Sequence, residues 1–195
     1  MVNGPTRMAA WLAEALTRRR VSLGFVSGAL VLWLAQPTAP ALAAGAAVAC
    51  AGEALRIWAA GHLNKSREIT SSGPYRWLAH PLYVGSSIMG AGLAIAAANA
   101  AAAALIGIYL AATLTTAVRS EEAFLRGTFG DRYDRYRRAK AGAAAPNSRD
   151  HVGRPFSAAQ ALANREHRAA IGLVVAVLLL LLKATYNSVF GRTRG

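Results

Sequence analysis

The sequence has little charge and almost no cysteine. Only 16% of its 195 residues are charged, whereas a soluble domain of this size carries about a quarter. Cys50 is the only cysteine, so an intrachain disulfide is excluded. No nucleophile elbow, no P-loop and no helical pair of zinc ligands is present, and the four histidines are scattered. We therefore predict no metal site and disfavour the soluble enzyme classes that depend on those motifs.

Acidic residues are also scarce. The chain has nine Asp and Glu residues and 22 Lys and Arg residues, which gives a net charge of +13. This balance first suggests a nucleic-acid-binding protein. However, the basic residues flank long apolar runs and form no stripe with interleaved aromatic side chains. We interpret them as juxtamembrane residues that face anionic lipid, and we expect no nucleic-acid partner.

Long apolar runs dominate the rest of the chain, which is 54% hydrophobic. They cover residues 21–35, 41–63, 82–98, 100–118 and 169–182, the last extendable to 186 if Lys183 snorkels. Backbone groups that face lipid must be hydrogen-bonded within their own segment, so each run should be a helix. The sequence predicts an all-α polytopic integral membrane protein with about five transmembrane helices.

We divide the predicted single domain, residues 1–195, into four parts. Residues 1–20 are expected to form an interfacial helix, 21–118 four transmembrane helices, 119–165 a cytoplasmic segment and 166–187 a C-terminal hydrophobic helix. The basic clusters fall on one side of the membrane by alternation. The positive-inside rule then places the N-terminus and the 62–81 loop in the cytoplasm, at the inner or plasma membrane if the protein is bacterial.

The segment 73–85 precedes the third apolar run and contains a helix-start signal, His80-Pro81. Proline at the first helical position gives up an N–H that has no partner there, and its φ suits the first turn. We expect the open N–H groups of that turn to favour a carboxylate or phosphate. Gly85, which has no side chain, could let a ligand approach the backbone.

The third and fourth runs should form a tight hairpin that turns at Asn99. Residues 81–99 and 99–119 span roughly 27 Å and roughly 30 Å at about 1.5 Å per residue, close to the hydrocarbon thickness of about 30 Å. Glu121 and Glu122 should therefore return to the depth of His80. In the plainer alternative these glutamates are solvated charges beyond a helix end, paired with Arg119 or Arg126, and His80 is an interfacial cap.

Two charged residues lie inside the second run. Glu53 and Arg56 are i, i+3 neighbours that can pair on one helix face. Ionisable groups inside a span are costly and usually face a cavity or a partner. Snorkelling to the cytoplasmic interface is the alternative for Arg56, and Trp58 nearby could anchor that interface. On the third run, the small residues at positions 86, 90 and 94 predict close helix packing.

Residues 119–140 are amphipathic, and Asp131 should cap a second helical piece after Gly130. A Pro/Asn/Ser-containing linker is expected over 141–150. Within this region, residues 129–136 read Phe-Gly-Asp-Arg-Tyr-Asp-Arg-Tyr.

Taken together, residues 50–140 resemble the isoprenylcysteine carboxyl methyltransferase and phospholipid methyltransferase families of membrane enzymes. The shared pattern is Gly-Pro-Tyr-Arg, Arg-His-Pro-x-Tyr-x-Gly, a hydrophobic hairpin, a Glu-Glu pair and Phe-Gly-x-x-Tyr-x-x-Tyr. The resemblance implies S-adenosyl-L-methionine as cofactor, held by a cytoplasmic segment. The residues that it assigns to cofactor binding are Tyr75, His80, Pro81, Tyr83, Gly85, Glu121, Glu122, Tyr133 and Tyr136. Catalytic roles are assigned to Glu53, Arg56 and Glu122.

The implied acceptor is a lipophilic molecule, either an isoprenylcysteine-like carboxylate or thiol or a lipid amine, that enters laterally from the bilayer while the cofactor enters from the cytoplasm. One position departs from the pattern, because Ala79 stands where the family has arginine before His-Pro. Arg76 and Arg119 are candidates to replace it. Two alternatives remain: an NADPH-dependent reductase of the related sterol reductase type, and a non-enzymatic helical membrane module. The dinucleotide fingerprint is incomplete, because Gly90-Ala91-Gly92 lacks the third glycine.

Overall fold

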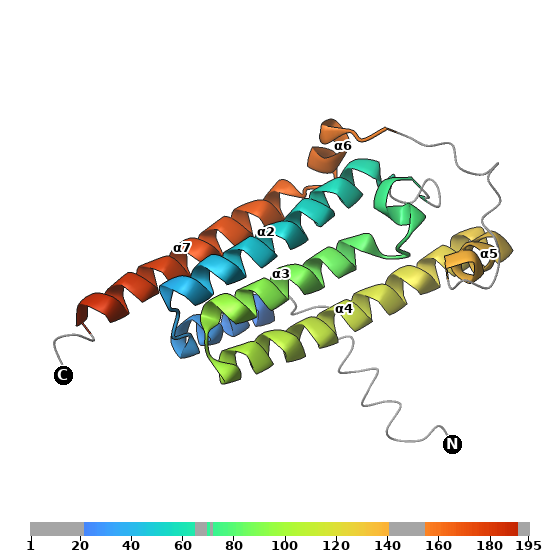
Figure 1. Cartoon of the computed structure of the whole chain (residues 1–195). Coiled ribbons are helices and arrows are strands. Elements are labelled where there is room, and N and C mark those ends of the chain that lie inside the picture. Colours follow the sequence, from blue (N-terminus) through green and yellow to red (C-terminus); the bar gives the residue numbers. More distant parts are fainter. Residues whose placement is uncertain (1–21, 65–69, 71, 141–154, 191–195) are drawn as a thin grey trace, which may run out of the picture.

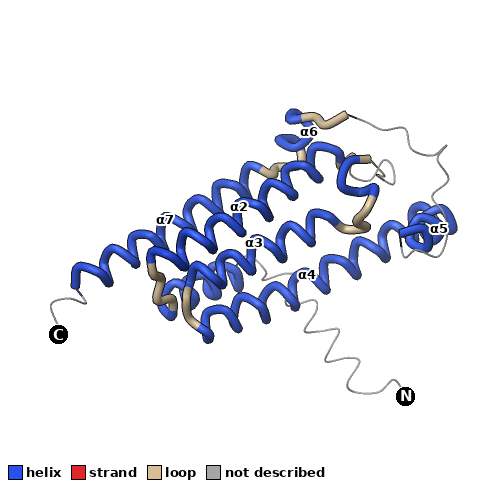
Figure 2. Tube along the Cα trace, in the orientation of Figure 1, coloured by secondary structure: helices blue, strands red, loops and turns tan. Residues whose placement is uncertain are grey.

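A computed structural model describes residues 22–64, 70, 72–140 and 155–190, and within these ranges every regular element is a helix (Figures 1 and 2). The elements are a first helix, Ser22–Leu34, followed by α2 (Ala39–His62), the 3-10 helix η1 (Gly73–Arg76), α3 (Pro81–Ala97), α4 (Ala100–Phe129), α5 (Asp131–Lys140), α6 (Ala158–Ala163) and α7 (His167–Phe190). The predicted interfacial helix and the linker 141–150 lie outside the described residues.

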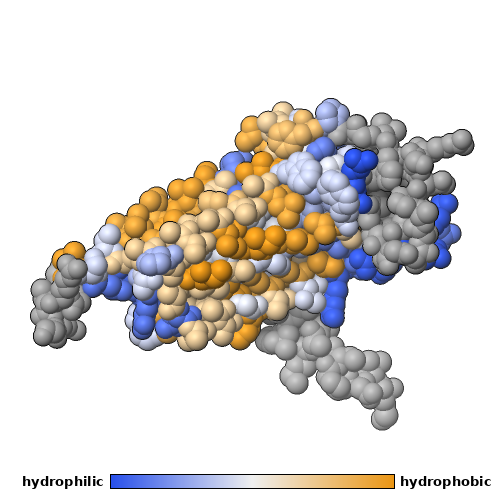
Figure 3. Space-filling view, in the orientation of Figure 1, coloured by the Kyte–Doolittle hydropathy of each residue, from blue (hydrophilic) through white to orange (hydrophobic). Residues whose placement is uncertain are grey.

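The helices confirm the all-α membrane fold. Three of them, α2, α4 and α7, are long and apolar enough to cross a membrane, and the first helix and α3 are shorter apolar helices. Large hydrophobic side chains face outward, among them Phe25 and Trp33, each about three-quarters exposed. Apolar residues cover much of the visible flank, whereas hydrophilic residues gather near α5 (Figure 3). An apolar exterior of this kind suits lipid and would be unfavourable in water.

Helices α2 and α3 pack backbone against backbone through paired glycines. Gly52 opposes Gly85, and Gly45 opposes Gly92. A Cβ added to Gly52 would lie 2.5 Å from the Met89 nitrogen and 2.6 Å from the Gly85 oxygen. In each helix the two glycines are seven residues apart, which keeps them on one face. Glycine at these positions lets the two helices approach closely, as small residues do in membrane helix pairs.

At the end of the bundle opposite α5, side chains form hydrogen bonds with backbone groups at the ends of helices. Asn99 accepts a hydrogen bond from Ala102 N–H (3.0 Å), and Ala98 turns with φ of +47°. The tight hairpin predicted at Asn99 is thus confirmed. Lys183 of α7 donates to the carbonyl oxygens of Leu32 and Trp33, at 2.5 and 2.6 Å. These oxygens lie at the C-terminal end of the first helix, where carbonyls lack partners within the helix.

Helix α4 continues well beyond the apolar run that predicted it. The run was expected to end at 118, but the helix ends at Phe129, before Gly130 (φ +48°). Residues 119–126 include Glu, Ala, Leu and Arg, which are good helix formers. With 30 residues, α4 is about 45 Å long and exceeds a hydrocarbon core of about 30 Å. The predicted second piece, α5, is confirmed. Asp131 is its first helical residue rather than its N-cap, because the Gly130 carbonyl accepts the first helical hydrogen bonds.

The segment that contains α6 is hydrogen-bonded to the C-terminal end of α2. The Asn164 side chain donates to the carbonyl oxygens of Ala60 and Leu63, both at 2.8 Å, and Gln160 also donates to Leu63 (3.0 Å). These bonds satisfy helix-end carbonyls that otherwise lack a partner. The sequence did not predict the short helix α6 that carries Gln160. From the α6–α7 turn, α7 runs back alongside α2 (Figure 1).

Candidate functional site

Helix α3 begins where the sequence predicted, with His80 as N-cap and Pro81 in the first turn. Of the N–H groups expected to be open, that of Tyr83 donates to the His80 carbonyl at 3.1 Å, which also accepts the first regular helical bond from Val84. Proline has no N–H. Fewer open N–H groups therefore remain for an anionic group than the sequence predicted.

The two ends of the hairpin meet at His80. Its Nε2 lies 3.2 Å from Glu122 Oε1, and its Nδ1 lies 3.8 Å from Glu121 Oε2. The predicted return of the glutamates to the depth of His80 is confirmed. Glu122 is not a solvated charge, because its side chain is only 14% exposed, whereas that of Glu121 is 38% exposed. The less buried Glu121 is the carboxylate more open to a ligand.

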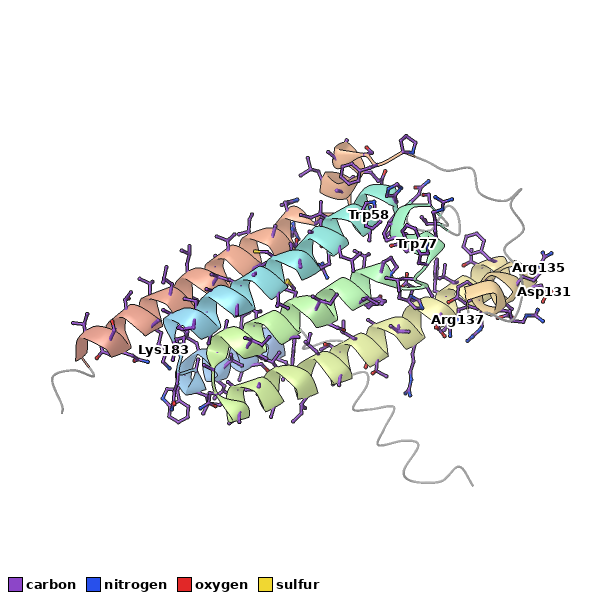
Figure 4. The ribbon with its side chains drawn as sticks, in the orientation of Figure 1. Trp58, Trp77, Asp131, Arg135, Arg137 and Lys183 are labelled. Atoms are coloured by element: carbon purple, nitrogen blue, oxygen red, sulfur yellow. The ribbon has the colours of Figure 1, made fainter. Side chains whose placement is uncertain are left out.

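Two arginines bind Glu122: Arg126, which the sequence offered as a pairing partner for the glutamates, and Arg137, which it did not. Arg137 Nη1 lies 2.8 Å from Glu122 Oε1, and Arg126 Nη2 lies 3.6 Å from Glu122 Oε2. Arg126 stands at i, i+4 spacing from Glu122, but Arg137 reaches Glu122 only because α5 folds back after Gly130 (Figure 4). The candidates proposed to replace the missing arginine, Arg76 and Arg119, are exposed side chains.

Aromatic rings border this cluster. The ring of Tyr83 lies 5.7 Å from that of His80, and the Glu121 carboxylate is close enough to affect the Tyr83 hydroxyl electrostatically. Tyr133 is buried, and the Arg126 guanidinium lies 5.9 Å from the centre of its ring. Burial raises the pKa of Tyr133, and the neighbouring Glu122 carboxylate adds to the shift. Tyr75 is buried in η1, and the Tyr136 side chain lies outside the described side chains.

A second group of polar side chains, which we name the Arg56 cluster, consists of Arg56, Glu53, Glu166 and Ser86. Arg56 Nε lies 3.2 Å from Glu53 Oε2, Nη2 lies 2.6 Å from Glu166 Oε1, and Nη1 donates to Ser86 Oγ. The predicted Glu53–Arg56 pair is therefore confirmed. Arg56 binds inward-facing partners, so snorkelling to the interface does not account for its place.

Gly85 connects this cluster to the helix packing. A Cβ at Gly85 would lie 2.6 Å from Arg56 Cγ and 2.7 Å from the Gly52 oxygen. The space that the missing side chain leaves is thus filled by α2 rather than left open for a ligand. Gly85 therefore acts through packing, by admitting the Arg56 side chain between the helices.

Along α3, the Arg56 cluster lies nearer the C-terminal end than the group formed by His80, Glu121 and Glu122. Ser86 follows His80 by six residues, which corresponds to about 9 Å along a helix axis. At the same end of the bundle, the exposed rings of Trp58 and Trp77 lie 6.0 Å apart (Figure 4). Paired tryptophans at one end suit the interface anchor predicted for Trp58. In the part of the chain that the structure describes, no group of three His, Cys, Asp or Glu could hold a metal ion.

Comparison with known proteins supports the resemblance seen in the motifs. Residues 41–132 match the model of the phospholipid methyltransferase family. Over 88 residues the chain is 31% identical to protein-S-isoprenylcysteine O-methyltransferase of Schizosaccharomyces pombe. That match covers 45% of this chain and 37% of the yeast protein, so the chain spans well under half of its relative. No solved structure matches. The family match contains α2, α3 and α4 but ends before α6 and α7.

Proposed function

We propose that this chain, whose residues 41–132 match the phospholipid methyltransferase family, is a membrane methyltransferase that uses S-adenosyl-L-methionine. The observation that carries the proposal is the meeting of His80 with Glu121 and Glu122 across the α3–α4 hairpin. The proposed acceptor is lipophilic, an isoprenylcysteine-like carboxylate or thiol or a lipid amine. The charge pattern of the sequence supports a site that faces the cytoplasm.

The donor set around His80 fits this cofactor. When bound, S-adenosylmethionine supplies a methyl group activated by a sulfonium. Its ammonium suits the half-exposed Glu121 carboxylate, and its carboxylate suits the guanidinium groups of Arg126 and Arg137. The face of Tyr83 suits a cation. We retain Tyr75, Pro81, Tyr133 and Tyr136 as further proposed lining residues, whereas Gly85 would contribute only by placing Arg56.

The chain's own residues would act mainly by positioning. His80 and the two arginines hold Glu122 in place through three contacts of 2.8 to 3.6 Å. The Arg56 cluster lies farther from the helix ends, and we propose that the acceptor reaches it laterally from the bilayer. Correct orientation and exclusion of water can supply much of the rate of such a transfer. We therefore assign Glu53 and Arg56 to the acceptor side and Glu122 to the cofactor side.

The direct test is calorimetric binding of S-adenosylhomocysteine to the full chain in detergent. We expect binding by the wild type and roughly tenfold or greater weakening in Glu121→Ala and in Tyr83→Ala, because each loses a contact to a charged group. Ser120→Ala, an exposed change beside Glu121, is the matched control and should bind as the wild type does.

Absence of binding by well-folded protein would refute the proposed function. Unchanged affinity in both variants would instead remove Glu121 and Tyr83 from the pocket. If reduced nicotinamide cofactor bound and S-adenosylhomocysteine did not, the reductase alternative would be favoured. If neither cofactor bound, the non-enzymatic module would remain.

A further inference from the structure

We propose that Glu166 sets the charge of the acceptor, so that the Arg56 cluster admits a neutral or cationic lipid head group and rejects a carboxylate. This inference rests on the proposed function, whose acceptor it narrows. Glu166 lies in the α6–α7 turn, outside the segment that matches the methyltransferase family. Its role would therefore belong to this chain's own C-terminal segment.

The first argument is that Arg56 is already occupied. Each of its three guanidinium nitrogens has a partner: Glu53 at Nε, Ser86 at Nη1 and Glu166 at Nη2. A guanidinium binds a carboxylate best through two parallel N–H groups. At the edge formed by Nε and Nη2, an acceptor carboxylate could form that pair only by displacing Glu53 or Glu166, and both carboxylates are buried.

The second argument is the charge balance. With both carboxylates ionised, two negative charges surround one guanidinium, and the cluster carries a net charge of −1. Glu53 Oε1 is buried and accepts no hydrogen bond from any group in the described part of the chain. A buried negative charge without compensation is costly unless a cation or a proton joins it. A cationic head group would relieve this excess, whereas an anionic one would add to it.

The third argument is that Glu166 is held firmly in place. Its N–H donates to the Ala161 carbonyl at 3.2 Å, and Asn164, two residues earlier, is bonded to the end of α2. The residue between them, Arg165, has φ of +62° and reverses the chain. A carboxylate fixed by such a turn is part of a built site rather than a mobile surface charge.

The test compares lipids that share a farnesyl tail but differ in head-group charge: farnesylamine, farnesol and N-acetyl-S-farnesylcysteine. Their binding to the full chain in nanodiscs is measured by calorimetry, with partitioning into empty nanodiscs subtracted. We expect the wild type to bind farnesylamine at least about tenfold more tightly than the carboxylate, because opposed like charges are strongly disfavoured. Glu166→Gln should lower that ratio at least about tenfold and improve binding of the carboxylate.

Asp131→Asn is the matched control, since it makes the same carboxylate-to-amide change at an exposed position of α5. It should leave the ratio unchanged. The inference is overturned if the wild type binds the carboxylate as tightly as the amine, if no farnesyl lipid binds, or if Glu166→Gln keeps the wild-type ratio. S-adenosylhomocysteine binding, measured on the same samples, separates these results from failure of the proposed function and shows whether Glu166→Gln is folded.

Discussion

Adding one methyl group at Gly92 tests whether the contact between α2 and α3 holds the bundle together. In Gly92→Ala the new Cβ would lie 2.5 Å from the Gly45 oxygen and 2.8 Å from the Ala49 Cα. Attractive contacts between heavy atoms lie at about 3.5 to 4.0 Å. Both obstructing atoms belong to the α2 backbone and cannot rotate away, so the helices would have to separate by about 1 Å.

The expected loss follows from two opposing effects. Overpacking of this kind costs about 1 to 3 kcal/mol, and rigid backbone obstruction places Gly92→Ala near the upper end. Alanine also stabilises the helix by about 1 kcal/mol relative to glycine, which offsets part of this loss. The net change is a loss of about 2 kcal/mol in the free energy of unfolding. For a chain of this size, that corresponds to a fall of about 4 to 8 °C in the Tm.

Gly107→Ala is the control, because a Cβ at Gly107 in α4 meets no atom within 4 Å. It should gain up to about 1 kcal/mol from helix propensity alone. Thermal unfolding of both variants in the same detergent, followed by tryptophan fluorescence, measures the difference. If Gly92→Ala and Gly107→Ala unfolded at the same temperature, the close approach of α2 and α3 would be wrong.

Two further predictions concern the cytoplasmic end of the bundle. Asn164→Ala should lower the free energy of unfolding by about 1 to 3 kcal/mol, because the Ala60 carbonyl loses the Asn164 donor and the Leu63 carbonyl keeps only that of Gln160. A Tm equal to that of the wild type would contradict this cap. Because burial raises the pKa of Tyr133 above 10.0, its contribution to stability is complete below about pH 10 and is lost as the pH rises through the folded pKa. Subtracting the tyrosinate absorbance of Tyr133→Phe from that of the wild type should isolate this late titration, and a midpoint at or below 10 would refute it.

The sequence predicted much of the hairpin because its lengths and caps are local properties. Run lengths of about 20 residues gave the depth at which Glu121 and Glu122 return. His80-Pro81 gave the start of α3, and Asn99 gave the turn. The structure brings Glu122 within 3.2 Å of His80, which required only that two helices of similar length lie side by side. The length of the apolar run did not predict the end of α4. The residues after 118 favour a helix, so α4 continues beyond the apolar residues to Phe129.

Partners from separate segments could not be predicted in this way. Arg137 reaches Glu122 only because Gly130 turns α5 back, and Glu166 reaches Arg56 across more than a hundred residues of sequence. The glycine pairs were partly visible, since both helices carry glycines at seven-residue spacing. Spacing alone does not say which helix faces meet. The prediction that Gly85 leaves room for a ligand was therefore wrong, because α2 packs against this position.

Composition and hydropathy by themselves determined that this chain is a helical membrane protein, because lipid requires each spanning segment to satisfy its own backbone. The motif spacing determined that a polar site lies at one end of a hairpin. Only the tertiary structure decided which charges are joined there. Ion pairs depend on where helix ends and turns bring side chains in space, and the free energy of those pairs depends on burial, which no local pattern records.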